Sequence, residues 1–172
     1  EGQTLKLLLR VPLESMSEII YPTWGPGYLD FEKADKALLD AIAVYLTDEL
    51  RVYENGELIL DKTVTAYRAE SPQNRAIQTW ETAIENINKP PLKNEERLYY
   101  GQAVLDVLYE FPITSDKSQF SIHPTLNKLA SITNTVLRFI PPETGERVFN
   151  YIGDPGEVVL DPSLLHALYE FM

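Results

Sequence analysis

The sequence predicts a mainly β protein, an antiparallel β-sandwich of immunoglobulin-like outline with two inserted helices. Roughly eight or nine short runs of residues either alternate apolar with polar side chains or are apolar throughout, as β-strands do. Short turns join successive runs, and short connections favour antiparallel pairing. The chain has ten tyrosines against six phenylalanines, and aromatic residues are common in strands. The alternative is an α+β fold with the helices on one face of an antiparallel sheet.

The N-terminal half begins with a strand, residues 4–12 (TLKLLLRVP), and a loop, residues 21–28 (YPTWGPGY). A helix over residues 30–49, capped by Asp30, is predicted next, because apolar residues recur at helical spacing. The apolar stripe of this helix consists of Phe31, Ala34, Leu38, Ala41, Ile42 and Tyr45.

Residues 50–60 predict a hairpin around Asn55-Gly56, because both residues of such a tight turn must accept a positive φ. A strand over residues 63–69 follows. A second helix begins at Ser71-Pro72 and ends at residues 89–91 (KPP), since proline interrupts helices. The apolar stripe of this helix is Ile77, Trp80, Ile84 and Ile87.

Up to residue 160, the C-terminal half is predicted to consist of strands and one helical turn, over residues 124–129. Residues 99–113 form a long strand that is half-buried on one face, with a bend near Gly101. Residues 119–123 form a short strand. Residues 132–140 and 146–152 form a hairpin, and residues 158–160 form a last short strand.

The last residues predict the start of another helix. Asp161 can cap it, and Pro162 suits the first helical position. The helix stops in an apolar run at Met172 without a C-cap glycine. We therefore expect one domain over residues 1–162, and residues 163–172 as the start of a helix that leads to a further, membrane-embedded domain.

The chain is acidic and lacks cysteine. A net charge of −11 makes nucleic acid and anionic lipid surfaces poor partners for the surface as a whole. The absence of cysteine excludes disulfides, thiolate metal sites and thiol catalysis.

Two histidines are the residues best suited to chemistry. His123 lies two residues after Ser121 on a predicted strand, but no G-x-S-x-G motif accompanies them, so a structural histidine is favoured over a hydrolase. His166 and Glu170 lie one helical turn apart and could provide half of a metal site. His166, Glu170 and His123 are thus the candidate metal ligands, and no catalytic residue is predicted.

Other candidate features have simpler explanations. Paired carboxylates such as Asp106 and Glu110 could serve a glycosidase only across a cleft. The loop aromatics Tyr21, Trp24 and Tyr28 could form a sugar- or peptide-binding platform, although buried loop aromatics are commoner.

Several stretches resemble the extracytoplasmic N-terminal region of HupE/UreJ-type bacterial membrane proteins. The segments that carry the resemblance are 27–30 (GYLD), 105–113 (LDVLYEFPI), 120–124 (FSIHP), 135–139 (TVLRF), 151–156 (YIGDPG) and 160–162 (LDP). The resemblance implies a location on the periplasmic face of the inner membrane, attachment to a C-terminal multi-pass domain, and a link to nickel through hydrogenase and urease maturation. It implies no catalytic residue in this region.

Three functions follow as hypotheses. The first is a non-catalytic periplasmic module for sensing or docking, with the chain's own C-terminal membrane domain as partner, a further protein partner unidentified, and no nucleic acid. The second is a metal-handling module that passes nickel or another divalent cation to a transporter through His166, Glu170 or His123. The third is a hydrolase that uses Ser121 and His123 or a carboxylate pair.

Overall fold

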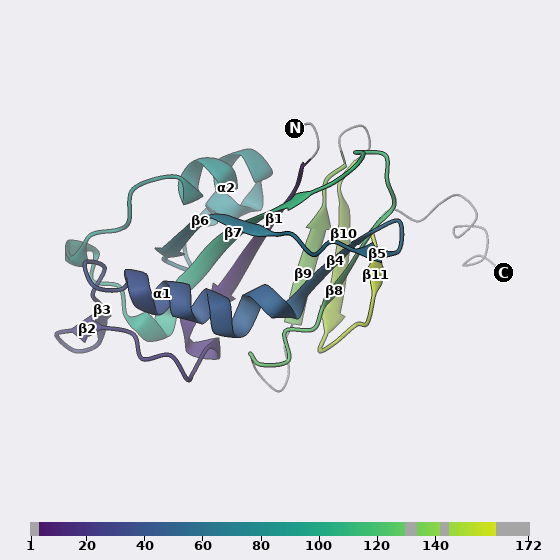
Figure 1. The fold of residues 1–172 in the computed structure, drawn as a ribbon. Coiled ribbons are helices and arrows are strands. Elements are labelled where there is room, and N and C mark those ends of the chain that lie inside the picture. The colour runs from purple at the N-terminus through teal and green to yellow at the C-terminus, as the bar shows by residue number, and fades with distance from the viewer. Residues whose placement is uncertain (1–3, 130–133, 142–144, 161–172) are drawn as a thin grey trace. The chain divides into compact units, whose positions relative to one another are not determined.

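The structure, a computed structural model, describes residues 4–129, 134–141 and 145–160. It is mainly β, with antiparallel strand pairs and two α-helices, so the predicted fold class is confirmed (Figure 1). The helices are α1 (Asp35–Ala41) and α2 (Trp80–Ile87). The strands are β1 (Thr4–Pro12), β2 (Thr23–Trp24), β3 (Tyr28–Leu29), β4 (Leu50–Glu54), β5 (Glu57–Leu58), β6 (Thr63–Glu70), β7 (Val104–Pro112), β8 (Phe120–Pro124), β9 (Asn134–Phe139), β10 (Arg147–Ile152) and β11 (Val158–Val159).

The chain divides into two compact units, each assembled from segments that are distant in the sequence. Unit 1 comprises Glu1–Leu5, Asp48–Lys62 and Phe111–Met172, and unit 2 comprises Lys6–Thr47 and Thr63–Glu110. The predicted boundary at residue 162 and the predicted helix over residues 163–172 lie outside the described residues, so both stay predictions.

Unit 2 contains a three-stranded sheet in the order β1-β7-β6. Strand β6 runs antiparallel to β7, with Thr63 opposite Glu110. Strand β1 also runs antiparallel to β7, because Lys6 forms an ion pair with Glu110 whereas Arg10 forms one with Asp106. The residue numbers of the partners on β7 therefore decrease as those on β1 increase, which is the mark of antiparallel strands.

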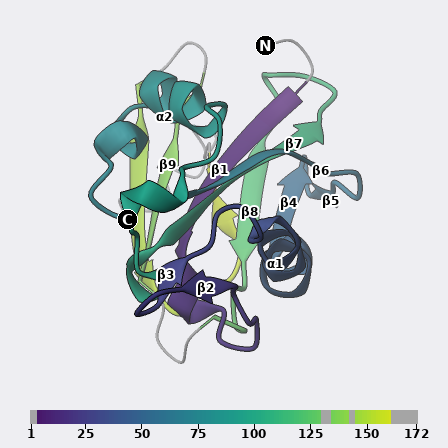
Figure 2. The ribbon, with the colours of Figure 1, turned by 90° about the vertical axis from the view of Figure 1, so that its left-hand side faces the viewer.

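Strand β7 is buried on both faces, so the prediction of a half-buried strand is wrong. Leu105, Val107 and Tyr109 on one face are fully buried, and Asp106 and Leu108 on the other face are each 4% exposed. The reason lies in the helices, since α1 and α2 cover opposite sides of this sheet (Figures 1 and 2). The strand also begins at Val104 rather than at residue 99, because residues 100–102 form a 3-10 turn.

The first helix begins five residues later than predicted. Asp30 does not cap it, because its Oδ1 accepts hydrogen bonds from the backbone N–H of Glu32 and the side chain of Asn94 instead. Helix α1 continues as a π-helical turn over Ile42–Leu46 and a 3-10 turn over Thr47–Glu49. Most of the predicted apolar stripe is confirmed as core, namely Ala34, Leu38, Ala41, Ile42 and Tyr45.

The second predicted helix is interrupted. Residues 75–78 form a 3-10 turn, and α2 begins only after Thr79, whose hydroxyl oxygen accepts the backbone N–H of Thr82 as an N-cap does. Among the residues that the structure describes, no helix is both long and apolar enough to cross a membrane.

Unit 1 contains a four-stranded sheet in the order β11-β8-β4-β5 and the two-stranded pair β9–β10. The predicted turn between β4 and β5 is confirmed, since φ is +51° at Asn55 and +82° at Gly56. The predicted hairpin of β9 and β10 is confirmed as well. The four-stranded sheet contributes to the core through Leu50, Val52, Phe120 and Ile122.

Candidate functional site

Ser121 and His123 of β8 bind two different carboxylates. The Ser121 hydroxyl, in a residue only 6% exposed, donates to Glu157 Oε1 at 2.5 Å. His123 Nε2 lies 2.8 Å from Asp154 Oδ1. Because the buried hydroxyl is directed at Glu157, Ser121 and His123 do not form the nucleophile–base pair that a hydrolase needs.

Both carboxylates belong to the segment that leads into β11. Asp154 Oδ1 also accepts the backbone N–H of Gly156 at 2.8 Å. The bond from Gly156, and then the contact with His123, hold the pKa of Asp154 below its usual value. Since β11 pairs with β8, these side-chain bonds fasten the turn before β11 to the neighbouring strand, which is a structural role.

The candidate metal ligands are not brought together by the described part of the chain. His123 is bonded to Asp154, and His166 and Glu170 lie outside the described residues. Within residues 4–129, 134–141 and 145–160, no group of three or more histidine and carboxylate side chains could hold a metal ion. The nickel hypothesis therefore stays a prediction that depends on His166 and Glu170.

The two carboxylates of β7, Asp106 and Glu110, each contact a basic side chain of β1. Asp106 receives two hydrogen bonds from Arg10, from Nε at 2.6 Å and from Nη2 at 2.8 Å. Glu110 lies 3.8 Å from the ammonium group of Lys6. These two carboxylates therefore hold β1 against β7, and their geometry does not resemble the open pair of a glycosidase.

The loop aromatics pack against a second aromatic segment. Ring centroids are 5.1 Å apart between Trp24 and Tyr28, 4.6 Å between Tyr28 and Tyr99, and 6.3 Å between Tyr21 and Tyr100. Burial raises the pKa of Tyr21. Tyr99 and Tyr100 each remain 42% exposed. The aromatic cluster therefore mainly packs the loop against this second segment, and two of its rings lie at the surface.

One exposed apolar surface lies on the β9–β10 hairpin. We call it the hairpin face, and it consists of Val136, Val148 and Ile152 of the two strands and Ile140 just after β9. These residues are exposed by 61%, 53%, 72% and 50%, respectively. Arg138, opposite Val148, and Asn150, opposite Val136, are exposed on the same face. Large apolar residues that gather on one exposed sheet face mark interaction sites more often than scattered ones do.

Within the described residues, β9 and β10 form a sheet only with each other. The sequence predicted both strands, and their alternation could have revealed the hairpin face. The exposure of this face in the described structure depends on tertiary packing, which no local sequence pattern indicates.

Comparison with known proteins finds no family model, no curated protein and no solved structure that matches this chain. The resemblance to HupE/UreJ-type proteins therefore stays a prediction.

Proposed function

We propose that this chain is a non-catalytic docking module on the periplasmic face of a bacterial inner membrane, within a HupE/UreJ-like multi-pass protein. Its partner is the chain's own C-terminal membrane domain, which it binds through the hairpin face. The observation that carries the docking role is the exposure of Val136, Val148 and Ile152 on one side of β9–β10, with Ile140 exposed just after β9. The location and the partner rest on the sequence resemblance.

The hairpin face offers enough apolar surface for a specific contact. Full burial of a valine or isoleucine side chain stabilises a complex by about 1.5–3 kcal/mol relative to full exposure. Half or more of each of the four side chains is exposed. A partner that covers all four therefore gains several kcal/mol.

The non-catalytic part of the proposal is supported by the partners of the polar side chains. Ser121 is buried against Glu157, and Asp106 and Glu110 each face a basic residue. Ser121 thus donates to a carboxylate and not to a histidine, and Asp106 and Glu110 each lie against a basic side chain, unlike the open carboxylate pair of a glycosidase.

The test is photo-crosslinking in the longer membrane protein. A photoreactive amino acid replaces Val136 or Ile152 in the hairpin face and, as matched controls, the exposed apolar residues Ile20 and Leu60, which are 92% and 81% exposed. We expect intramolecular crosslinks to the C-terminal domain from the two hairpin positions and none from the controls. All four side chains are exposed, so the substitutions should leave the fold intact.

Three outcomes would overturn the proposal. Equal crosslinking from the control positions would show that the hairpin face is not selective. Products that join two copies of the chain would identify a homo-oligomer interface, and products with lipid alone would identify a membrane-contact surface.

A further inference from the structure

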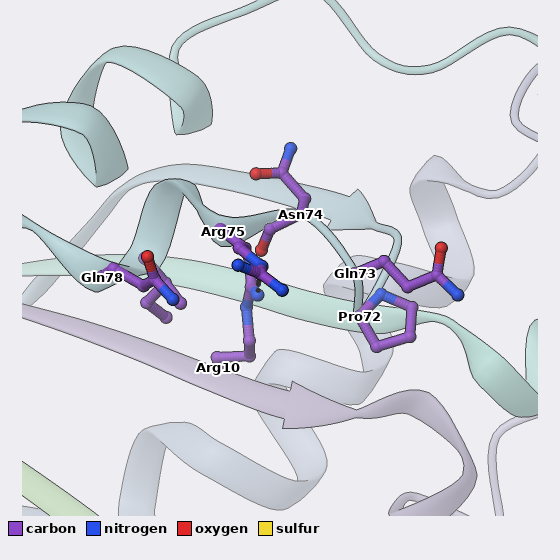
Figure 3. Close-up of a pocket in the computed structure, with 7 residues that line it drawn as sticks. Arg10, Pro72, Gln73, Asn74, Arg75 and Gln78 are labelled. Carbon is purple, nitrogen blue, oxygen red and sulfur yellow. Dashed lines mark hydrogen bonds between the residues drawn. The ribbon is translucent and has the colours of Figure 1, made fainter.

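We propose that a hollow in unit 2 binds a small organic carboxylate through Arg10 and Arg75. The hollow has a volume of about 520 Å³ and is lined by Arg10 of β1 and by six residues of segment 72–78 (Figure 3). The lining contains two arginines and no aspartate or glutamate. In a chain with a net charge of −11, such a concave cationic surface would attract an anion that the rest of the surface repels.

Arg10 provides a fixed guanidinium group. It is held by Asp106 through Nε and Nη2, and Nη1 donates to the backbone carbonyl of Asn74 at 2.9 Å. Among the described residues, acceptors thus occupy three of its five N–H groups, and each terminal nitrogen keeps one proton for another acceptor. Since the side chain is only 16% exposed, its donors are positioned before any ligand arrives.

Arg75 provides the charge that is not neutralised. Its side chain is exposed, and within the described residues it takes part in no hydrogen bond or ion pair. Asp106 offsets the charge of Arg10, so the excess positive charge of the hollow belongs to Arg75. The five donors of a guanidinium group form a planar fork that matches a carboxylate.

The segment that carries Arg75 is itself anchored. Asn74 Oδ1 accepts the backbone N–H of Ala76 at 2.8 Å, and Asn74 Nδ2 donates to Asn86 on α2 at 3.3 Å. Asn86 in turn donates to the buried carboxylate of Glu70. This chain of hydrogen bonds connects β6, α2 and the segment, which keeps the two arginines on the same hollow.

The other lining residues favour an organic acid over a bare ion. Pro72 and Ile77 are apolar, and Gln73 carries an amide that could bond to a second polar group of the ligand. The volume lies within the range of about 300–1,000 Å³ that small-molecule sites occupy. Inorganic phosphate shares the acceptor chemistry of a carboxylate, so an experiment must separate the two.

The test is an NMR titration of the 172-residue chain with succinate, and separately with inorganic phosphate, at constant ionic strength. We expect saturable shifts in the backbone amides of residues 73–78 with succinate. Arg75→Gln should weaken binding at least about tenfold, because it removes bonds to a charged group. Arg75→Lys should recover only part of the affinity, since an ammonium group lacks the planar fork.

Arg97→Gln is the matched control, because Arg97 is also an exposed arginine of unit 2 and lies outside the hollow. It should bind succinate as the unaltered chain does. Shifts that fail to saturate, or that persist in Arg75→Gln, would overturn the proposal. Saturable binding of phosphate without binding of succinate would also overturn it, because the ligand class would then be wrong.

Discussion

At the scale of single residues, the carboxylate of Glu54 accepts several hydrogen bonds within unit 1. Its Oε1 accepts the backbone N–H and the hydroxyl of Thr114 at 2.9 and 2.7 Å, and the hydroxyl of Ser118 at 2.7 Å. The backbone N–H of Ser115 donates to the same atom. Burial alone would raise the pKa of Glu54, but these hydrogen bonds outweigh it and lower the pKa.

We therefore expect Glu54→Gln to lower the free energy of unfolding at pH 7 by about 1–3 kcal/mol, the range for bonds to a charged group. Because the folded-state pKa lies below the unfolded-state value, the stabilisation is complete above the unfolded pKa and is lost as the pH falls through the folded pKa. Urea unfolding at a series of pH values measures this dependence.

The matched control for that prediction is Glu57→Gln, which changes the same charge in the same hairpin. Its exposed side chain makes no hydrogen bond or ion pair within the part of the chain that the structure describes. The substitution should change the stability at pH 7 by less than about 0.5 kcal/mol. The account of Glu54 would be wrong if both variants lost the same stability, or if the deficit of Glu54→Gln persisted unchanged to pH 2.

At the scale of elements, the pairing of β1 with β7 depends on a buried ion pair. Arg10 and Asp106 are 16% and 6% exposed. Removing one partner, as in Arg10→Met or Asp106→Leu, leaves an uncompensated charge and should cost about 3–5 kcal/mol. The double variant should be more stable than the sum of the single losses predicts, and a double-mutant cycle by urea denaturation measures the difference.

The same two strands carry a control pair. Lys6 and Glu110 are 33% and 34% exposed and lie 3.8 Å apart, so their coupling energy should not exceed about 1 kcal/mol. Losses at Arg10 and Asp106 that add without coupling would contradict the ion pair's role in joining β1 to β7.

The element boundaries show what the sequence could and could not predict. The β4–β5 turn was predictable because Asn55-Gly56 specifies its own backbone conformation. The start of α1 was not, because Asn94, 64 residues away, contributes a hydrogen bond to Asp30. Likewise, the charge of Asp106 indicated that its side of β7 faces solvent. Its ion pair with Arg10, 96 residues away, allows that side of the strand to be buried instead.

At the scale of the whole molecule, the two units alternate along the chain, which no local pattern indicates. The chain passes from one unit to the other after residues 5, 47, 62 and 110. Strands β1 and β7 each contribute residues to both units. The hollow between Arg10 and segment 72–78 was unpredictable for a related reason, since its two parts are more than 60 residues apart.

This interleaving predicts that the units unfold together. Both tryptophans, Trp24 and Trp80, belong to unit 2, so tryptophan fluorescence reports on unit 2, whereas Glu54 belongs to unit 1. We expect Glu54→Gln to lower the urea midpoint of tryptophan fluorescence as much as that of far-UV circular dichroism. Coincident transitions are the mark of two-state unfolding. A biphasic dichroism curve with an unshifted fluorescence midpoint would instead show that each unit folds independently, even though β1 and β7 pass through both.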